Sequence, residues 1–370
     1  MRIASYNVES LFDRAKALNP NDREAGKAAL EAHARINHLL GEPVYTDAVR
    51  KQIADLLREL GLEKKDDGGS YARLRQNRGH LVKRSNGAVQ VVAGGRDDWI
   101  GWVELEKEPV NELATRHTAA VMHDVDAQVM AVIEADNRPA LHDFSDILLC
   151  QVGARPFDHV MLIDGNDDRG IDVGLLTRKG YDIVGIRSHV DDGTPRSRTF
   201  SRDCPEYTVT TPSGETLVLL VNHLKSKGFG RQADNDARRE RQATEVAKIY
   251  RRLRSEGRRY VAVVGDFNDT PDSAPLKSLI AGTDLRDISD HPAFVSDGRP
   301  GTFGNGSKSS KIDYILMSPA LFKKVTAGGV FRKGVWGGKN GTLFEHYPTM
   351  TKPSEAASDH AAIYADVGGL

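Results

Sequence analysis

The chain has 370 residues and nearly balanced charge, with 51 lysines and arginines against 52 aspartates and glutamates and a formal net charge of −1. This length allows two or three average domains, or one large domain that carries an insertion. The balanced charge excludes a globally cationic nucleic-acid binder of the histone kind, although a local basic face can still bind phosphate backbones. Hydrophobic residues make up 39% of the chain, which is enough for a sizeable buried core.

The two cysteines and the hydropathy pattern indicate the cellular compartment that we expect for the protein. Cys150 and Cys204 are far apart and lack metal-ligand spacing, which favours two reduced thiols over one disulfide. Residues 2–6 look like a strand rather than the apolar core of a signal peptide, and no apolar run is long enough to span a bilayer. We therefore expect a cytoplasmic protein without a membrane partner. The alternative is a secreted form whose leader has been removed.

The first predicted strand, residues 2–6, ends in Asn7-Val8-Glu9, after which the pattern changes. Residues 23–40 and 46–62 have helical patterns, and residues 66 to about 108 form short β-like pieces around glycine-rich turns. We assign residues 13–112 to an inserted α+β lobe. Residues 1–12 and 113–370 then form the α/β domain that carries the candidate site.

Beyond the insertion, the sequence predicts a series of short strands with nearly continuous apolar character, which is typical of strands covered on both faces. A strong amphipathic helix is predicted at about 235–255, with Val246, Ile249, Tyr250 and Leu253 on one face. This pattern predicts an α/β fold of two packed mixed sheets flanked by helices. The predicted strands are 129–133, 159–163, 171–177, 217–221, 260–264, 311–317 and 361–367.

Polar side chains recur at one kind of place, the ends of these apolar strands. A single polar residue at a strand edge is usually a turn or cap residue, but five such sites in one chain favour a shared function. If the strand ends converge, they supply oxygen ligands without a cysteine, which suits Mg²⁺ or Mn²⁺ rather than a structural zinc. The chemistry implied is attack of water on phosphorus, with a carboxylate aligning the water and a histidine steadying the phosphate. The residues are Asn7, Glu134, Asn222 with His223, Asp266 with Asn268, and Asp359 with His360.

Six short motifs in this order resemble the signature of the endonuclease/exonuclease/phosphatase superfamily, in a form similar to bacterial members. That superfamily includes the deoxyribonuclease I-like and exonuclease III-like enzymes, so the resemblance implies their α/β-sandwich fold. Any one tripeptide is a weak signal, whereas six in order are a strong one. The motifs are Tyr6-Asn7-Val8-Glu9, Ile133-Glu134, Asn222-His223-Leu224-Lys225-Ser226, Gly265-Asp266-Phe267-Asn268, Lys311-Ile312-Asp313-Tyr314-Ile315-Leu316 and Ser358-Asp359-His360.

The resemblance implies a role for each matching position. Asn7, Glu134 and Asp359 match the metal-site residues, and Glu9 stands where some members carry a further acid that touches the metal. Asp266 matches the aspartate that positions the attacking water, and Asn268 matches its phosphate-contacting neighbour. His360 matches the catalytic histidine, and His223 resembles a second histidine found in some branches.

Asp313 matches the carboxylate that fixes the tautomer of the catalytic histidine. Chemistry points to the same role, because a histidine acting on phosphate needs one ring nitrogen committed to a partner. The alternative is that Asp313 only caps or pairs within the sheet.

Arg169-Gly170-Ile171-Asp172 resembles a short segment of bacterial relatives. Arg169 could hold the substrate phosphate through its fork of donors, and Asp172 could orient His223. An ordinary surface turn with one ion pair is the alternative for both residues. Asn222 and Lys225 complete the expected substrate-binding set.

A nuclease is the preferred function, since the segment 222–228 resembles bacterial extracellular-type deoxyribonucleases and Lys225, Lys227 and Arg231 lie nearby for phosphate contact. We expect a metal-dependent phosphodiesterase with nucleic acid, DNA in preference, as its substrate, and a monomer. A phosphatase or phosphodiesterase acting on a small phosphorylated molecule or a lipid headgroup is the alternative. A binding module that has lost catalysis is a remote third.

Three motifs are set aside. Asp266-Phe267-Asn268-Asp269-Thr270-Pro271 resembles the start of an EF-hand loop, but Pro271 takes the position of the invariant glycine. No phosphate-binding P-loop or dinucleotide fingerprint occurs. The arginine run at 238–254 favours a solvated helix face over a nucleic-acid track.

Within the insertion, residues 71–84 are rich in arginine and are followed by Trp99 and Trp102. For a nuclease, Arg73, Arg75 and Arg78 would extend the substrate groove. The alternatives are a lid over a small substrate and a stabilising appendage with solvated charges.

Overall fold

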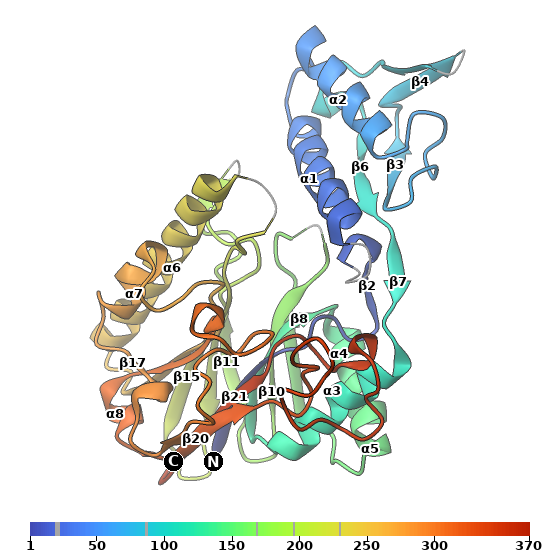
Figure 1. The fold of residues 1–370 in the computed structure, drawn as a ribbon. Coiled ribbons are helices and arrows are strands. Elements are labelled where there is room, and N and C mark those ends of the chain that lie inside the picture. Colours follow the sequence, from blue (N-terminus) through green and yellow to red (C-terminus); the bar gives the residue numbers. More distant parts are fainter. Residues whose placement is uncertain (19–22, 86–87, 168, 195–196, 229–230) are drawn as a thin grey trace. The chain divides into compact units, whose positions relative to one another are not determined.

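The computed structural model describes residues 1–18, 23–85, 88–167, 169–194, 197–228 and 231–370. The chain divides into two units, of which unit 1 comprises Met1–Phe12 with Val110–Leu370 and unit 2 comprises Asp13–Pro109 (Figure 1). Residues 110–112, which we assigned to the insertion, belong to unit 1. The Val110 N–H donates to the Phe12 carbonyl oxygen at 2.7 Å, and Glu112 begins a helix of unit 1.

The first sheet of unit 1 has seven strands in the order β18-β20-β21-β1-β8-β10-β9. The neighbours β1 and β8 run parallel, whereas β1 and β21 run antiparallel, so the sheet is mixed. Its strands are β1 (Arg2–Asn7), β8 (Val129–Ala135), β9 (His159–Ile163), β10 (Asp172–Thr177), β18 (Phe294–Val295), β20 (Val325–Phe331) and β21 (Ala362–Val367).

The second sheet has six strands in the order β11-β14-β15-β16-β19-β17. The central pair β15 and β16 runs parallel, and β16 pairs antiparallel with β19. Its strands are β11 (Ile183–Arg187), β14 (Glu206–Thr210), β15 (Thr216–His223), β16 (Tyr260–Asp266), β17 (Arg286–Asp287) and β19 (Asp313–Met317). A separate two-strand ladder joins β12 (Gly193–Thr194) and β13 (Ser197–Arg198).

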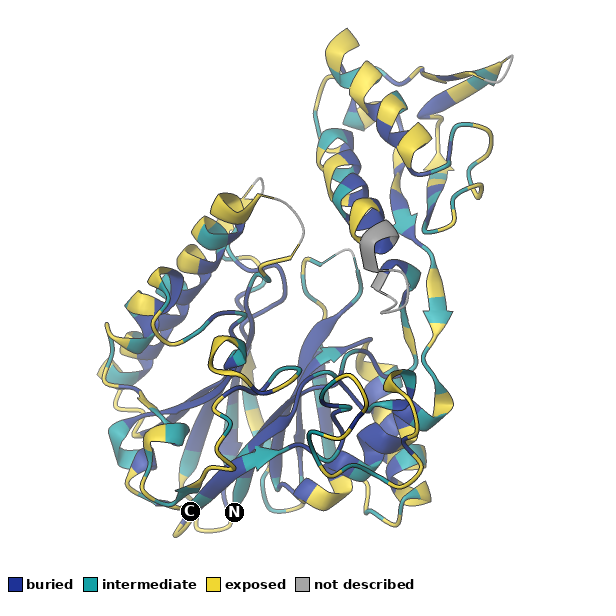
Figure 2. Ribbon diagram, in the orientation of Figure 1, coloured by how far each residue is buried: buried dark blue, intermediate teal, exposed yellow. Residues whose placement is uncertain are grey.

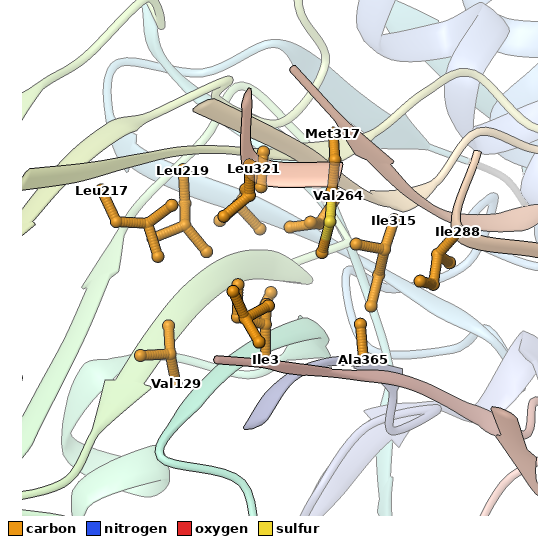
Figure 3. Packing of buried hydrophobic residues seen from close by; sticks show 14 of the residues in the cluster. Ile3, Val129, Leu217, Leu219, Val264, Ile288, Ile315, Met317, Leu321 and Ala365 are labelled. Carbon is orange, nitrogen blue, oxygen red and sulfur yellow. The ribbon is translucent and has the colours of Figure 1, made fainter. Parts of the chain in front are cut away.

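The two sheets pack face to face around one apolar core. Ile3 and Val129 of the first sheet lie opposite Leu219 and Val264 of the second (Figure 3). The outer face of the first sheet is covered by α3 (Glu112–Val125), α4 (Arg138–Asp143) and α5 (Leu149–Gln151). The outer face of the second is covered by α6 (Gln232–Ser255) and α7 (Lys277–Ile280), and a further short helix, α8 (Pro319–Phe322), follows β19. Figure 2 shows the strands buried between these layers.

The predicted α/β fold of two packed mixed sheets flanked by helices is confirmed. Every strand predicted beyond the insertion is present, β9 with the predicted bounds and the others with one or both ends shifted, and the four apolar residues of the long helix are buried. Among the elements that the prediction missed are α3, β14 and β20. In β20, Thr326 and the pair Gly328-Gly329 interrupt the apolar pattern, which hides a strand from a periodicity argument.

The described residues of unit 2 form two α-helices and three two-stranded ladders. Within it, Trp99 is fully buried, and its indole N–H donates to the Tyr45 hydroxyl at 3.0 Å. Its elements are β2 (Asp13–Ala15), α1 (Arg23–Leu40), α2 (Asp47–Glu59), β3 (Ala72–Arg78), β4 (Val82–Ser85), β5 (Ala88–Val91), β6 (Ile100–Leu105) and β7 (Lys107–Pro109). In the described part of the chain, no helix is both long and apolar enough to cross a bilayer.

Candidate active site

Strand directions explain why polar residues far apart in sequence meet at one end of the sandwich. Because β1 runs parallel to β8, and β15 to β16, the carboxyl ends of each pair lie together, with Asn7 beside Ile133 and His223 beside Asp266. The antiparallel strand β19 brings its first residue to the same end, where Asp313 pairs with Asp266. The expected convergence of strand ends is therefore observed for these residues.

The two sheets also meet across this end. Asn7 continues the core-facing row of β1 after Ile3, and Asp266 continues the core-facing row of β16 after Val264. The Asn7 Nδ2 atom lies 3.3 Å from Asp266 Oδ2 on the opposite sheet and 3.2 Å from Glu134 Oε1 on its own sheet. Asn7 thus joins the carboxylates of both sheets.

Glu134 reaches this cluster only because β8 is irregular. Strict alternation would place its side chain with Val132, on the helix-covered face of the sheet. Glu134 instead has φ +64°, and the register between β8 and β10 shifts at this point, so Glu134 is the extra residue of a β-bulge. The bulge turns its carboxylate toward Asn7 and toward His223, whose Nε2 lies 3.4 Å from Glu134 Oε1.

His360 and Asp313 form a buried pair. The His360 Nδ1 atom lies 2.8 Å from Asp313 Oδ2, and the Thr302 hydroxyl donates to the same carboxylate oxygen at 2.6 Å. Burial disfavours the charged imidazole, but the charge and hydrogen bond of Asp313, with Asp266 and Asp359, raise the pKa of His360 well above its ordinary value. His360 is therefore held as a cation with Nε2 directed at Asp266, 3.9 Å away.

Asp266 is the centre of the cluster. It is buried, and its two carboxylate oxygens accept from Asn268, Oδ1 from the backbone N–H at 2.8 Å and Oδ2 from the side-chain amide at 3.1 Å. Burial, reinforced by the charge of Asp313, raises the pKa of Asp266 to about 8. Asn268 has φ +55°, which folds its amide back onto the carboxylate. A carboxyl with a pKa near neutrality suits proton transfer from water.

His223 is the second buried histidine of the site. Its Nε2 lies 3.6 Å from Asp266 Oδ2, whereas its buried Nδ1 has no hydrogen-bond partner among the described residues. Burial and the positive charges of Arg202 and Arg169 lower the pKa of His223 well below its ordinary value, so it is neutral. Asp172, which we expected to orient His223, accepts instead from the Gly165 N–H at 2.7 Å.

Asn222 does not join the cluster. It alternates with His223 along β15 and follows Leu220 on the face that packs against α6. Its Nδ2 donates to the Leu220 carbonyl at 3.0 Å, and the residue is buried. The pleat of the strand turns neighbouring side chains to opposite faces, so the structure places Asn222 away from His223, and its contact with substrate stays a prediction.

Arg169 lies near the site, but its guanidinium fork is engaged by Asp167, with Nε and Nη2 at 2.9 and 2.7 Å from the two carboxylate oxygens. Arg202 pairs with the same carboxylate at 3.0 Å and is only 1% exposed. Sequence reasoning missed Arg202, because a lone arginine in an irregular segment carries no periodic or motif signal.

Lys225 follows β15, and its backbone is fixed by α6. Its N–H donates to Gln242 Oε1 at 2.7 Å, and its carbonyl accepts from Arg239 at 2.7 Å. Burial and the charges of Arg169, Arg202 and Arg238 lower the pKa of Lys225 to about 8. Arg239 itself is fully buried and pairs with Asp269, so the arginine run of α6 is not wholly a solvated face as we predicted.

The described residues offer two groups of side chains close enough to hold one ion, Glu134 with His223 and Asp266, and Asp266 with Asp313 and His360. The first group fits a divalent cation, since Glu134 Oε1 and Asp266 Oδ2 both face Asn7, and His223 Nε2 lies 3.4 and 3.6 Å from these two oxygens. Asn7 can add its amide oxygen, as amides do in such sites.

Asp359 and Glu9 stand at the edge of the cluster. Neither belongs to the two groups found among the described residues. The Asp359 N–H donates to Glu9 Oε2 at 3.0 Å, and Asp359 Oδ1 lies 3.7 Å from His360 Nε2. This hydrogen bond joins the segment after β1 to the segment before β21. A metal-binding role for Asp359 or Glu9 stays a prediction.

Two of the three arginines of unit 2 that we expected to form a basic surface, Arg73 and Arg75, are paired with acids. Arg73 binds Glu106, with its Nε 2.6 Å from the carboxylate, and Arg75 binds Glu104 at 2.6 Å. Of the two tryptophans, Trp99 is buried and Trp102 is 42% exposed. These pairs leave less uncompensated positive charge than the sequence suggested.

Comparison with solved structures finds similar proteins of low sequence identity. Mannosyl-6-phosphatase Bt3783 of Bacteroides thetaiotaomicron has 16% identity and a TM-score of 0.51, covering 70% of this chain and 92% of that one. An endonuclease/exonuclease/phosphatase family protein of the same organism has 17% identity and a TM-score of 0.49, and the match covers 68% of this chain and 88% of that one. The catalytic domain of human Nocturnin with bound sulfate has 15% identity and a TM-score of 0.46, and the match covers 70% of this chain and 87% of that one.

A comparison with characterised protein sequences gives no significant match. The model of the Endonuclease/Exonuclease/phosphatase family matches residues 105–360, which include every candidate site residue beyond the insertion. Members of this family hydrolyse phosphoester bonds and typically use a divalent metal. The chain belongs to the endonuclease/exonuclease/phosphatase family.

Proposed function

We propose that this chain is a divalent-metal-dependent phosphodiesterase, and that it is a nuclease using Mg²⁺ or Mn²⁺. The observation that carries the proposal is the placement of Asp266 between Asn268 and two histidines, one charged and one neutral, beside Glu134. This arrangement contains a base, a cation and a hard-oxygen metal site within one buried cluster.

Each residue has a distinct part in the hydrolysis. Glu134 and Asn7 would hold the cation, which when bound neutralises charge on the phosphate and polarises a phosphoryl oxygen. Asp266 accepts the proton of the attacking water, and Asn268 fixes the carboxylate in position. His360, charged because Asp313 holds it, stabilises the negative charge that develops on the phosphate.

His223 completes the site as a neutral imidazole beside Glu134 and Asp266. A neutral ring can donate a hydrogen bond to a phosphate oxygen without competing with a cation for the carboxylates. Every position of the expected machinery holds a chemically competent residue, which argues against a binding module that has lost catalysis.

Positive charge near the site supports a nucleic-acid substrate. Arg169 and Arg202 lower the pKa of His223, and the same two arginines act on Lys225. A positive electrostatic field of this kind increases the binding affinity of a polyanion more than that of a substrate with a single phosphate.

A small phosphorylated substrate is the second candidate, and a cavity favours it. A cavity of about 920 Å³, lined in part by Thr302, Phe294, Lys308 and Lys311, adjoins the Thr302 hydroxyl that holds Asp313. Its volume lies in the usual range for small-molecule sites, and lysines there could pair with an anionic group.

Parallel assays separate these functions. The purified protein is incubated with Mg²⁺, and then with Mn²⁺, on plasmid DNA, a labelled oligonucleotide, a chromogenic phosphodiester and a chromogenic phosphomonoester. The proposal predicts metal-dependent cleavage of the DNA substrates and slower hydrolysis of the simple diester. Hydrolysis of the monoester alone would replace the nuclease proposal with the phosphatase alternative. Hydrolysis of none of the four substrates would overturn both functions.

A further inference from the structure

The buried face of α6 changes character along the helix. In its C-terminal half this face is apolar, with Val246 and Tyr250 packed on the second sheet. Toward the N-terminus the same face carries Gln242, Arg239 and Asn235, which follow at helical spacing and are all buried. We call these three residues the polar stripe.

The polar stripe bonds the main chain of residues 225–228, which we call the lysine loop. Gln242 Oε1 accepts from the Lys225 N–H at 2.7 Å, and Arg239 Nη1 donates to the Lys225 carbonyl oxygen at 2.7 Å. Arg239 Nε also donates to the Asp269 carboxylate at 2.9 Å. One guanidinium thus joins the lysine loop to the loop that follows β16.

Asn235 holds the far end of the lysine loop. Its Nδ2 donates to the Gly228 carbonyl oxygen at 3.4 Å, and the Lys225 ammonium donates to the same oxygen at 3.2 Å. Because one carbonyl oxygen binds both groups, Asn235 fixes the place of the Lys225 side chain as well as the end of the loop.

The lysine loop begins beside the candidate active site. The Leu224 N–H donates to the Asp266 carbonyl oxygen at 2.9 Å, and the Leu224 carbonyl accepts from the Asn268 side-chain amide at 3.1 Å. Lys225 is half-buried. A lysine ammonium has three donors, so Lys225 can keep its bond within the loop and also bind a phosphate oxygen.

Helix packing alone does not account for the polar stripe. A buried charge such as that of Arg239 is costly to desolvate, and apolar residues of similar volume often give equal or greater stability. The stripe instead supplies partners for the backbone groups of the lysine loop and so fixes its conformation. A loop fixed in advance loses less conformational entropy when its side chains bind a ligand.

We propose that Asn235, Arg239 and Gln242 are positioning residues for substrate binding, which hold the lysine loop so that the Lys225 ammonium binds a phosphate oxygen of the substrate. This inference rests on the proposed function and deepens it, because it assigns part of the substrate affinity to residues that do not touch the substrate.

Gln242→Met tests the inference, since it removes the acceptor for the Lys225 N–H at similar side-chain volume. The variant should raise KM for a labelled oligonucleotide about tenfold, the effect of one misplaced charge-assisted hydrogen bond. Its kcat should stay within about threefold of the parent, because the lost contact is made equally in the bound substrate and in the transition state. A folded variant with the KM of the parent would overturn the inference, and so would a lower kcat at unchanged KM.

A double-mutant cycle shows whether Gln242 acts through the lysine. Lys225→Met should raise KM about tenfold, and adding Gln242→Met should raise it by less than about twofold more. Full effects of both changes in the double variant would contradict positioning through Lys225. The matched control is Lys248→Met, an exposed lysine of α6 that pairs with Glu245 at 2.8 Å and should leave KM within about twofold of the parent. A loss equal to that of Lys225→Met would assign the effect to general charge.

Asn235→Ala is the second variant, in case Gln242→Met does not fold. It removes one hydrogen bond at the far end of the lysine loop, where the exposed Gly228 can bind water instead, and should raise KM about threefold. Thermal melts establish that the variant is folded. A folded Asn235→Ala variant with the KM of the parent would count against the polar stripe.

A binding measurement separates failure of this inference from failure of the proposed function. Fluorescence anisotropy of the labelled oligonucleotide in EDTA needs no turnover, and Gln242→Met and Lys225→Met should each weaken binding about tenfold. If the oligonucleotide is bound with this pattern but not cleaved, the positioning role stands and the proposed function fails. If it is cleaved but the variants bind it like the parent, the positioning role fails. A parent that neither binds nor cleaves it would overturn both.

Discussion

The chemistry of this site depends on a few side chains whose protonation is set by their neighbours. Asp266 has a pKa of about 8 because it is buried beside Asp313, and His360 is charged because Asp313 holds it. His223, a few ångströms away, is kept neutral by burial and by two arginines. One cluster thus holds a weak acid, a cation and a neutral imidazole. Sequence reasoning alone named all three residues as candidates, but it could not predict their charge states.

Asp313 and His360 should act as one unit. Because the carboxylate holds the imidazole through a hydrogen bond of 2.8 Å, Asp313→Asn and His360→Gln should each lower kcat about 100-fold, and the double variant should lose little more. The measurement is a double-mutant cycle on kcat. Losses that add in log rate would show that the two residues work separately.

Glu134 is expected to bind the metal, because it is the acid that the β-bulge turns into the cluster. Glu134→Gln should raise the Mg²⁺ concentration for half-maximal activity at least about tenfold, with activity partly restored at high metal. Glu215→Gln, an exposed glutamate, is the control and should titrate like the parent. Identical titrations for Glu134→Gln and the parent would remove Glu134 from the metal site.

At the scale of elements, apolar strands and their polar ends could be predicted from sequence, but irregular backbone could not. The strand containing Glu134 was predicted, whereas its bulge depends on how β8 registers against β10. Asn222 and His223 are adjacent in sequence, yet the pleat sends only His223 to the site. Arg202 and Asp167 lie in loops, and their pairing depends on a contact between two distant segments.

A buried histidine near the edge of the second sheet predicts a pH dependence of stability. His189 lies between Asp192 and Glu206, with Nδ1 and Nε2 at 2.7 and 2.6 Å from their carboxylates. Burial opposes its charge, but these hydrogen bonds raise the pKa of His189. A raised pKa in the folded state adds stability that is complete below about pH 6.5 and is lost as the pH rises through the folded value.

The free energy of unfolding should therefore fall as pH is raised above about 6.5, and fall less in His189→Gln. Denaturant unfolding at several pH values measures how steeply the free energy of unfolding falls with pH in the parent and in the variant. Parallel curves for the variant and the parent would show that His189 does not titrate in this way.

For the whole molecule, the family and the α/β sandwich could be predicted because six motifs lie on successive core elements. The inserted unit carries none of these motifs, so its role could not be predicted in the same way. The ion pairs of Arg73 and Arg75 also show that a basic stretch of sequence need not become a basic surface.

Unit 1 should fold without unit 2. The three apolar clusters of unit 1 contain no residue of Asp13–Pro109, and Phe12 and Val110 are joined by a hydrogen bond of 2.7 Å. Replacing residues 13–109 by a short glycine-serine linker should shift the melting temperature of unit 1 by less than about 5 °C. Thermal melts followed by circular dichroism test this, and a chain without a cooperative transition would contradict it.

The central claim is that Asp266 activates water at a metal-dependent phosphodiesterase site. The most direct measurement compares Asp266→Asn with the parent, using a labelled oligonucleotide, Mg²⁺ and thermal melts of both proteins. The variant is expected to melt like the parent, because Asn keeps the shape of the Asp side chain, and its rate should fall at least about 100-fold, because an amide cannot accept the proton of the attacking water. A folded variant with a rate near that of the parent, or a parent rate that chelation of the metal leaves unchanged, would contradict it.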